Sequence, residues 1–206
     1  ILPVKSFVKL DTVVKVKEAG DEPQKFSSAS GFFVAENLIV TAGHFCDLDS
    51  VFMFFFNKGM TLEKIAFFLE TFDGDVRMAS VTKIDKAADL CLMKIEGETE
   101  SIDKVILELS DTPPVVGESV VNIAAPLGIF TAHMVPIFSG YYCGTSLSED
   151  GKQTIDLYSL PIISGSSGSP VLNSRGKVVG VVVAGLKNFQ HLGFSPSYGV
   201  VKKFLE

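Results

Sequence analysis

The chain has 206 residues, of which 47% are hydrophobic and 20% are charged, a balance typical of a globular protein with a substantial core. Its formal net charge is −6 and its lysines are interspersed with acidic residues, which argues against a nucleic-acid-binding surface. No run of about 18 apolar residues occurs, so no membrane span is expected.

Three cysteines, Cys46, Cys91 and Cys143, cannot all pair within one chain, and no two of them have zinc-ligand spacing. No partner for Cys46 is evident from the sequence. Unpaired thiols slightly favour a reducing compartment such as a host cytoplasm, while an exported protein without disulfides stays open. The compartment is otherwise undetermined.

Short runs rich in Val, Ile and Phe, bounded by Gly, Asp, Asn and Pro, predict strands throughout the chain. The predicted strands are residues 12–16, 31–35, 38–41, 51–56, 90–95, 119–123, 135–143, 153–157, 171–172 and 178–183. Many short strands separated by turn residues indicate an all-β sandwich or barrel. Within this set, residues 51–56 (VFMFFF) are interpreted as a buried strand.

Helical periodicity is scarce. Residues 60–70 are ambiguous, because Leu62, Ile65 and Leu69 fit a helix while the adjacent phenylalanines do not. At the end of the chain, Ser197 is expected to cap a short helix. Residues 97–118 are acidic and contain Pro-Pro, and they separate two strand-rich halves, which predicts a linker between two β lobes.

A histidine and a carboxylate both occur next to apolar strands. His44 follows the apolar run of LIVTAGH, and Asp89 immediately precedes the strand LCLMKI. Most lone histidines and aspartates in such places have structural or turn roles. His133 and His191 lie in polar, turn-like surroundings with no comparable scaffold.

The stretch GSSGSP, residues 165–170, supplies a serine that is followed directly by a glycine and preceded by another glycine two residues earlier. Gly, Ser and Pro clusters usually mark a turn and nothing more. Glycines, however, also permit a tight backbone whose successive N–H groups point into one hollow, as a tetrahedral oxyanion requires. A serine is a poor nucleophile until a base takes its proton and a third group orients that base. The order His, Asp, Ser, each bordered by strands, therefore points to nucleophilic catalysis.

These motifs, TAGH, DLCLMKI and GSSGSP, resemble the catalytic motifs of chymotrypsin-fold serine endopeptidases, and are most similar to HtrA/Deg-type and related bacterial or viral trypsin-like peptidases. The resemblance covers nearly the whole chain. It implies two six-stranded antiparallel β-barrels with a short C-terminal helix. One protease domain is expected, with residues 1–108 forming the barrel that carries His44 and Asp89 and residues 109–206 the barrel that carries Ser167 and the S1 pocket.

The resemblance also implies residue roles. His44 is the general base, Asp89 orients it, and Ser167, which precedes Gly168-Ser169-Pro170, is the nucleophile. The oxyanion hole would be formed by the backbone N–H groups of Gly165 and Ser167. No metal or cofactor is needed.

Two departures from the family pattern matter. Trypsin buries an activated N-terminus against an aspartate just before the nucleophile, but Ser166 occupies that position here, so activation through Ile1 is not expected. The primary specificity pocket maps onto five uncharged residues, which predicts a neutral, apolar P1 side chain. These residues are Pro161, Val182, Val183, Ala184 and Gly185. His191 is expected at the surface.

The sequence therefore predicts a serine endopeptidase that acts on polypeptide substrates through an acyl-enzyme. Processing of a viral or phage polyprotein and HtrA-like quality control both stay open as roles, and so does an inactive, protease-fold binding module. Neither the natural substrate nor the oligomeric state follows from the sequence.

Overall fold

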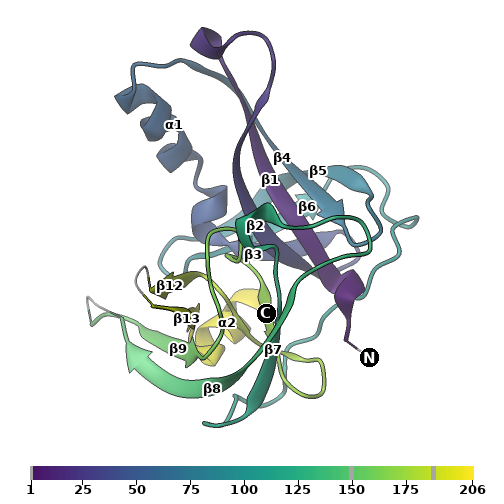
Figure 1. Ribbon diagram of the computed structural model, residues 1–206, viewed down its shortest axis with the longest axis vertical. Coiled ribbons are helices and arrows are strands. Elements are labelled where there is room, and N and C mark those ends of the chain that lie inside the picture. The colour runs from purple at the N-terminus through teal and green to yellow at the C-terminus, as the bar shows by residue number, and fades with distance from the viewer. Residues whose placement is uncertain (1, 149–150, 187–188) are drawn as a thin grey trace.

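The computed structural model describes residues 2–148, 151–186 and 189–206, so Ile1 lies outside the described residues. Six strands of the first half close into a barrel in the order β1-β2-β3-β6-β5-β4, seen in the upper part of Figure 1. These strands are β1 (Phe7–Val16), β2 (Gln24–Ala35), β3 (Leu38–Ala42), β4 (Leu62–Thr71), β5 (Val76–Asp85) and β6 (Leu90–Ile95). Every pairing within this barrel is antiparallel.

The barrel forms because its strands alternate between inward and outward residues. Along β1, buried and half-buried positions alternate from Val8 onward, so Val8 and Leu10 enter the barrel core with Phe33 and Met93. A period of two residues is what a pleated strand with one buried face requires. The predicted strands at 12–16, 31–35, 38–41 and 90–95 are confirmed within these elements.

The second half forms a seven-stranded antiparallel sheet in the order β11-β10-β7-β8-β9-β13-β12. Its strands are β7 (Ser119–Ile123), β8 (Ile137–Leu147), β9 (Thr154–Tyr158), β10 (Pro170–Leu172), β11 (Val178–Val181), β12 (Ala184–Leu186) and β13 (Phe189–Pro196). Only Val182 and Val183 separate the two end strands, so the sheet curls until its ends meet. Counted as one interrupted strand, β11 and β12 make a six-stranded barrel, and the predicted all-β, chymotrypsin-like fold is confirmed.

Two helices and four short 3-10 turns accompany the strands. The helices are α1 (Leu48–Asn57) and α2 (Tyr198–Leu205), and the turns are η1 (Val4–Ser6), η2 (Lys17–Ala19), η3 (Gly43–Cys46) and η4 (Pro126–Gly128). The predicted C-terminal helix is confirmed, but the Ser197 side chain does not cap it. Instead, the carboxylate of Asp156 accepts a 2.7 Å hydrogen bond from the Tyr198 N–H. Among the described residues, neither helix has the length and apolar character needed to cross a membrane.

The interpretation of residues 51–56 as a buried strand is wrong, because they lie in α1. Val51 and Phe55, one helical turn apart, are buried, while Phe52 and Phe56 are exposed. A continuous apolar run has no period that separates a helix from a strand, so only the surrounding packing decides. Here Val51 and Phe55 pack with Val14 and other residues of the barrel rim.

The ambiguous segment 60–70 is a strand, not a helix. It forms β4, which pairs with β1 along its whole length and buries Phe67 and Leu69 on one face. Strand β5 was not predicted. Only Ala79 of β5 is buried, so its sequence lacks an apolar alternation that would have revealed it.

A disulfide joins Cys46 to Cys91, and the exposed Cys143 is the free cysteine of the described chain. The expectation that all three cysteines are unpaired is therefore wrong. The two cysteines are 45 positions apart in sequence, and only the pairing of β3 with β6 brings them together. The argument for a reducing compartment loses its basis.

An apolar cluster fills the junction between the two halves. Phe7, Phe32 and Leu90 of the first barrel pack there with residues of the second half, including Leu172 and Phe204. Helix α2 lies against the second sheet (Figure 1), and its C-terminal end also reaches the first barrel, because the Lys83 ammonium donates a 2.8 Å hydrogen bond to the Phe204 carbonyl. This junction places the C-terminal end of β3 and the N-terminal end of β6 beside the loop before β10.

Candidate active site

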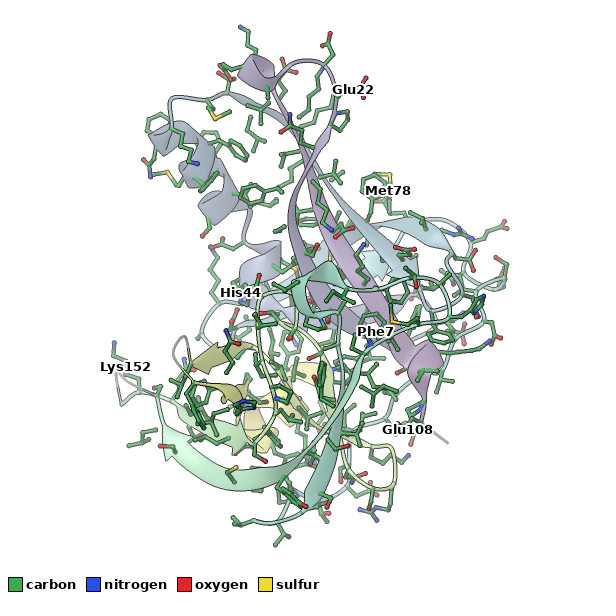
Figure 2. The ribbon with its side chains drawn as sticks, in the orientation of Figure 1. Phe7, Glu22, His44, Met78, Glu108 and Lys152 are labelled. Atoms are coloured by element: carbon green, nitrogen blue, oxygen red, sulfur yellow. A yellow bond between two sulfur atoms is a disulfide. The ribbon has the colours of Figure 1, made fainter. Side chains whose placement is uncertain are left out.

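His44 is held in one orientation by Asp89. The imidazole Nδ1 lies 2.8 Å from one carboxylate oxygen of Asp89, and the backbone N–H of His44 donates a 2.6 Å hydrogen bond to the other. With Nδ1 donating to the carboxylate, Nε2 is left without a proton and can act as a base. Figure 2 shows His44 where the first barrel meets the second sheet.

The backbone of Asp89 is itself constrained. Its φ angle is +53°, an uncommon value for a residue with a side chain. Its carbonyl accepts a 2.8 Å hydrogen bond from the N–H of Gly43. A Cβ atom on Gly43 would lie 2.9 Å from the Asp89 carbonyl carbon, so glycine is required for this close approach. The segments carrying His44 and Asp89 are thus locked together.

The pKa of His44 is raised above the ordinary value for histidine. The main cause is the hydrogen bond with Asp89, and the negative charge of that carboxylate adds to it, while partial burial of the ring acts in the opposite direction. The imidazolium form is therefore favoured by its partner. A base of this kind accepts a proton more readily than a free histidine does.

The four serines of the turn differ in accessibility. Ser166 and Ser169 are fully buried, and the Ser169 hydroxyl accepts a 2.8 Å hydrogen bond from Asn122. Ser164 is exposed and Ser167 is half-buried. Only the last two can meet a substrate, because the buried pair is enclosed by protein.

Ser164 and Ser167 border two pockets. The first, of about 310 Å³, is here named the α1 pocket, and its lining is Phe26, Ser27, Ser28, Ala29, His44, Phe45, Ser50, Val51, Phe54, Ser164, Gly165 and Ser167. The structure thus brings His44 and Ser167 to one cavity. The second, of about 280 Å³, is named the Gln190 pocket, and its lining is Ile162, Ile163, Ser164, Ser167, Ala184, Gly185, Leu186 and Gln190.

Of the five residues predicted for the specificity pocket, Ala184 and Gly185 line the Gln190 pocket. Val182 is instead fully buried in the core of the second sheet, and Val183 packs against the junction cluster. Pro161 is not among the described residues that line the pocket.

Sequence reasoning missed Ile162, Leu186 and Gln190, because only the tertiary packing brings these residues to the pocket and no local pattern marks them. His191 is exposed and its ring contacts Phe189, in keeping with the surface position expected for it.

Ser30 of β2 links the first barrel to residues 164–169, here named the serine loop. Sequence reasoning missed Ser30 too. Its N–H donates to the Ser167 carbonyl and its hydroxyl donates to the Gly165 carbonyl, both at 2.8 Å. The same hydroxyl accepts a 2.9 Å hydrogen bond from the N–H of Ala125. The sequence offers no signal that singles it out, because Ser27 and Ser28 are small polar residues of the same strand.

Two backbone N–H groups at the turn are free to bind an anion. Within the described chain, the N–H groups of Gly165 and Ser167 have no hydrogen-bond acceptor. Leu127 donates a 2.6 Å hydrogen bond to the Ser164 carbonyl. Because a trans peptide points its C=O and N–H in opposite directions, this bond turns the Gly165 N–H away from Leu127. Such free donors are the elements of an oxyanion hole.

A two-lobed β fold that places a histidine–aspartate pair and an accessible serine at one cavity is the arrangement of a chymotrypsin-like serine protease domain. Comparison with known families agrees, because residues 29–181 match the model of the trypsin-like peptidase domain. The chain therefore belongs to the trypsin-like peptidase family.

Two curated relatives are similar over part of the chain. HhoB from Synechocystis sp., named as a candidate serine protease, is 32% identical over 127 residues, which are 60% of this chain and 29% of that protein. The uncharacterized protein y4bJ from Sinorhizobium fredii is 31% identical over 117 residues, 55% of this chain and 17% of that protein. The matched region thus spans less than a third of either relative.

Proposed function

We propose that the chain is a serine endopeptidase in which Ser167 is the nucleophile, His44 the general base and Asp89 the residue that orients His44. The observation that carries the proposal is the His44–Asp89 pair, joined by two hydrogen bonds, beside a cavity that Ser167 also lines. In this scheme one protease domain has two lobes, residues 1–108 and 109–206, with the catalytic groups at their junction.

The reaction follows from these positions. As Ser167 Oγ attacks the scissile carbonyl carbon, its proton passes to Nε2 of His44, and the imidazolium that forms is stabilised by Asp89. The C–N bond then breaks, His44 gives the proton to the leaving amine, and the acyl group remains on Ser167. Water, deprotonated by His44, releases the acid and restores the serine.

The negative charge on the substrate oxygen would be bound by the N–H groups of Gly165 and Ser167. Loss of one such donor typically costs about 2.7–4 kcal/mol of transition-state stabilisation. The hydrogen bond from Leu127 to the Ser164 carbonyl supports this role, since it orients the Gly165 N–H. No ammonium at a chain terminus is needed in this arrangement, which fits the uncharged Ser166 before the nucleophile.

The residue before the scissile bond would enter the Gln190 pocket. Ile162, Ala184 and Leu186 make its walls apolar, and no charged side chain is among the described residues that line it. A cavity of about 280 Å³ accommodates a medium-sized neutral side chain, and the amide of Gln190 offers one hydrogen-bonding group. We therefore expect polypeptide substrates with a neutral, apolar P1 residue.

The test is labelling by a fluorophosphonate probe, which reacts with activated serines. The native protein should be labelled at neutral pH, and Ser167→Ala should abolish labelling and lower kcat on the order of 10⁶-fold. Ser164→Ala is the matched control, because Ser164 is the other accessible serine of both pockets and should leave labelling intact. Absence of labelling in the native protein would favour the inactive binding module.

Two roles would use the same chemistry, excision of the chain from a viral or phage polyprotein and HtrA-like quality control. Expression of a longer natural precursor, with and without Ser167→Ala, separates them. Cleavage at the ends of this chain that depends on Ser167 would support self-excision, and an uncleaved precursor with an active protease would support the other role.

A further inference from the structure

The α1 pocket and the Gln190 pocket lie on either side of the serine loop. Among the described residues they share Ser164 and Ser167 and nothing else. His44 lines the α1 pocket and not the Gln190 pocket. A substrate that crosses Ser167 therefore places one flank in each pocket, provided that the function proposed above holds.

The chemistry decides which flank enters which pocket. His44 must give its proton to the amine that leaves, so the leaving part of the substrate lies on the His44 side of Ser167. The acyl part, which stays on Ser167, lies on the other side. The α1 pocket therefore receives the residue that follows the scissile bond, and the Gln190 pocket the residue that precedes it.

Five apolar side chains line the α1 pocket, beside His44 and several serines. Phe26 and Ala29 come from β2, Phe45 from η3, and Val51 and Phe54 from α1. Among the described lining residues no Asp, Glu, Lys or Arg occurs. A charged side chain entering this cavity would lose hydration, and its apolar walls would not compensate for that loss.

Helix α1 packs against the barrel rim next to the pocket. Val51 and Phe55 are buried against the barrel rim, and the Phe26 ring lies 5.2 Å from that of Phe55 and 5.1 Å from that of Phe54. Phe54 nevertheless remains 42% exposed. The Lys58 ammonium lies 4.3 Å from the centroid of its ring, and the remaining exposed part of the ring is apolar surface that a substrate can cover. In Figure 1, α1 stands beside the barrel rather than within it.

We propose that the α1 pocket selects a bulky aliphatic or aromatic side chain at the first position after the scissile bond, and that Phe54 and Phe26 determine this selection. The pocket volume of about 310 Å³ is sufficient for a leucine or phenylalanine side chain. Loss of one methylene from such a pocket lowers kcat/KM about 10- to 200-fold, so leucine should exceed glycine or aspartate by at least about tenfold.

The experiment compares quenched fluorescent peptides that share one acyl part and carry Leu, Phe, Gly or Asp after the scissile bond. The native protein should prefer Leu and Phe in kcat/KM. Phe54→Ala should reduce this preference several-fold, and Phe54→Lys should raise cleavage of the Asp peptide. Phe52→Ala is the matched control, because Phe52 lies on the same helix, is 55% exposed and does not line the pocket.

A substrate with a coumarin amide in place of the following residue separates the two proposals. Cleavage of this substrate by the native protein, together with the peptide preferences above, supports the inference. Equal cleavage of all four peptides, with the coumarin amide still cleaved, overturns the inference and leaves the proposed function standing. Failure to cleave the coumarin amide and all four peptides would count against the proposed function itself.

Discussion

Removing the Cys46–Cys91 disulfide should destabilise the protein while leaving its site nearly intact. The perturbation is the double variant Cys46→Ala, Cys91→Ala, or reduction of the native protein. The bond closes a loop between residues 45 positions apart. In the chain-entropy description, opening a loop of this length costs about 4 kcal/mol of unfolding free energy at 25 °C.

This loss converts into a measurable shift of the melting temperature. For a chain of 206 residues, unfolding entropies of about 2.1 cal/mol/K per residue give a decrease of roughly 9 °C. Activity at 25 °C should change little, because the pairing of β3 with β6 and both hydrogen bonds between His44 and Asp89 remain. The loss of activity should appear only near the lowered melting temperature.

Differential scanning calorimetry of the native and double-variant proteins measures the shift, with Cys143→Ser as the control that removes only the free thiol. Thiol titration of the denatured, unreduced protein should find one reactive cysteine, and titration after reduction should find three. Three reactive thiols before reduction, or a melting temperature shifted by less than about 2 °C, would refute the reasoning.

Two further predictions concern the catalytic pair and the turn. The hydrogen bond with Asp89 raises the pKa of His44, and the proposed mechanism needs the neutral imidazole, so kcat/KM should fall as pH drops through a midpoint above the usual histidine value. In Asp89→Asn this midpoint should move to lower pH and kcat should fall on the order of 10⁴-fold. An unmoved midpoint would contradict the assignment. Gly168→Ala should lower the free energy of unfolding, measured with urea, by more than the cost of about 1–2 kcal/mol that a left-handed backbone imposes on a residue with a side chain. The additional loss is expected because the new Cβ would lie 2.1 Å from the Ser30 carbonyl oxygen. Gly176→Ala, at φ +74° in open space, should show the backbone cost alone, and equal losses in the two variants would rule out the clash.

Several features of the candidate site could be predicted from short stretches of sequence. His44 at the end of an apolar strand and Asp89 before another are local patterns, and the structure brings the two side chains within hydrogen-bonding distance. Ser167 stands out because it precedes Gly168-Ser169-Pro170. The roles of Gly165 and Gly168 also have a local cause, since both adopt φ angles near +90° that side chains rarely tolerate.

Other features depended on residues far apart. Ser30 holds Gly165 across 135 positions of sequence, and no pattern around either residue indicates the contact. The lining of the Gln190 pocket was predicted only in part. Val182 was predicted to line it but is buried in the core, whereas Ile162 and Gln190 line it and were not predicted.

By itself, the sequence determined the all-β class, most strands and the residues of the candidate site, because alternation, glycine turns and strand ends are properties of consecutive residues. Only the tertiary structure decided that residues 51–56 are helical, that Cys46 pairs with Cys91, and which serines remain accessible. Burial and proximity depend on segments that strand pairing brings together. A continuous apolar run or a lone cysteine does not indicate which distant residues it will contact.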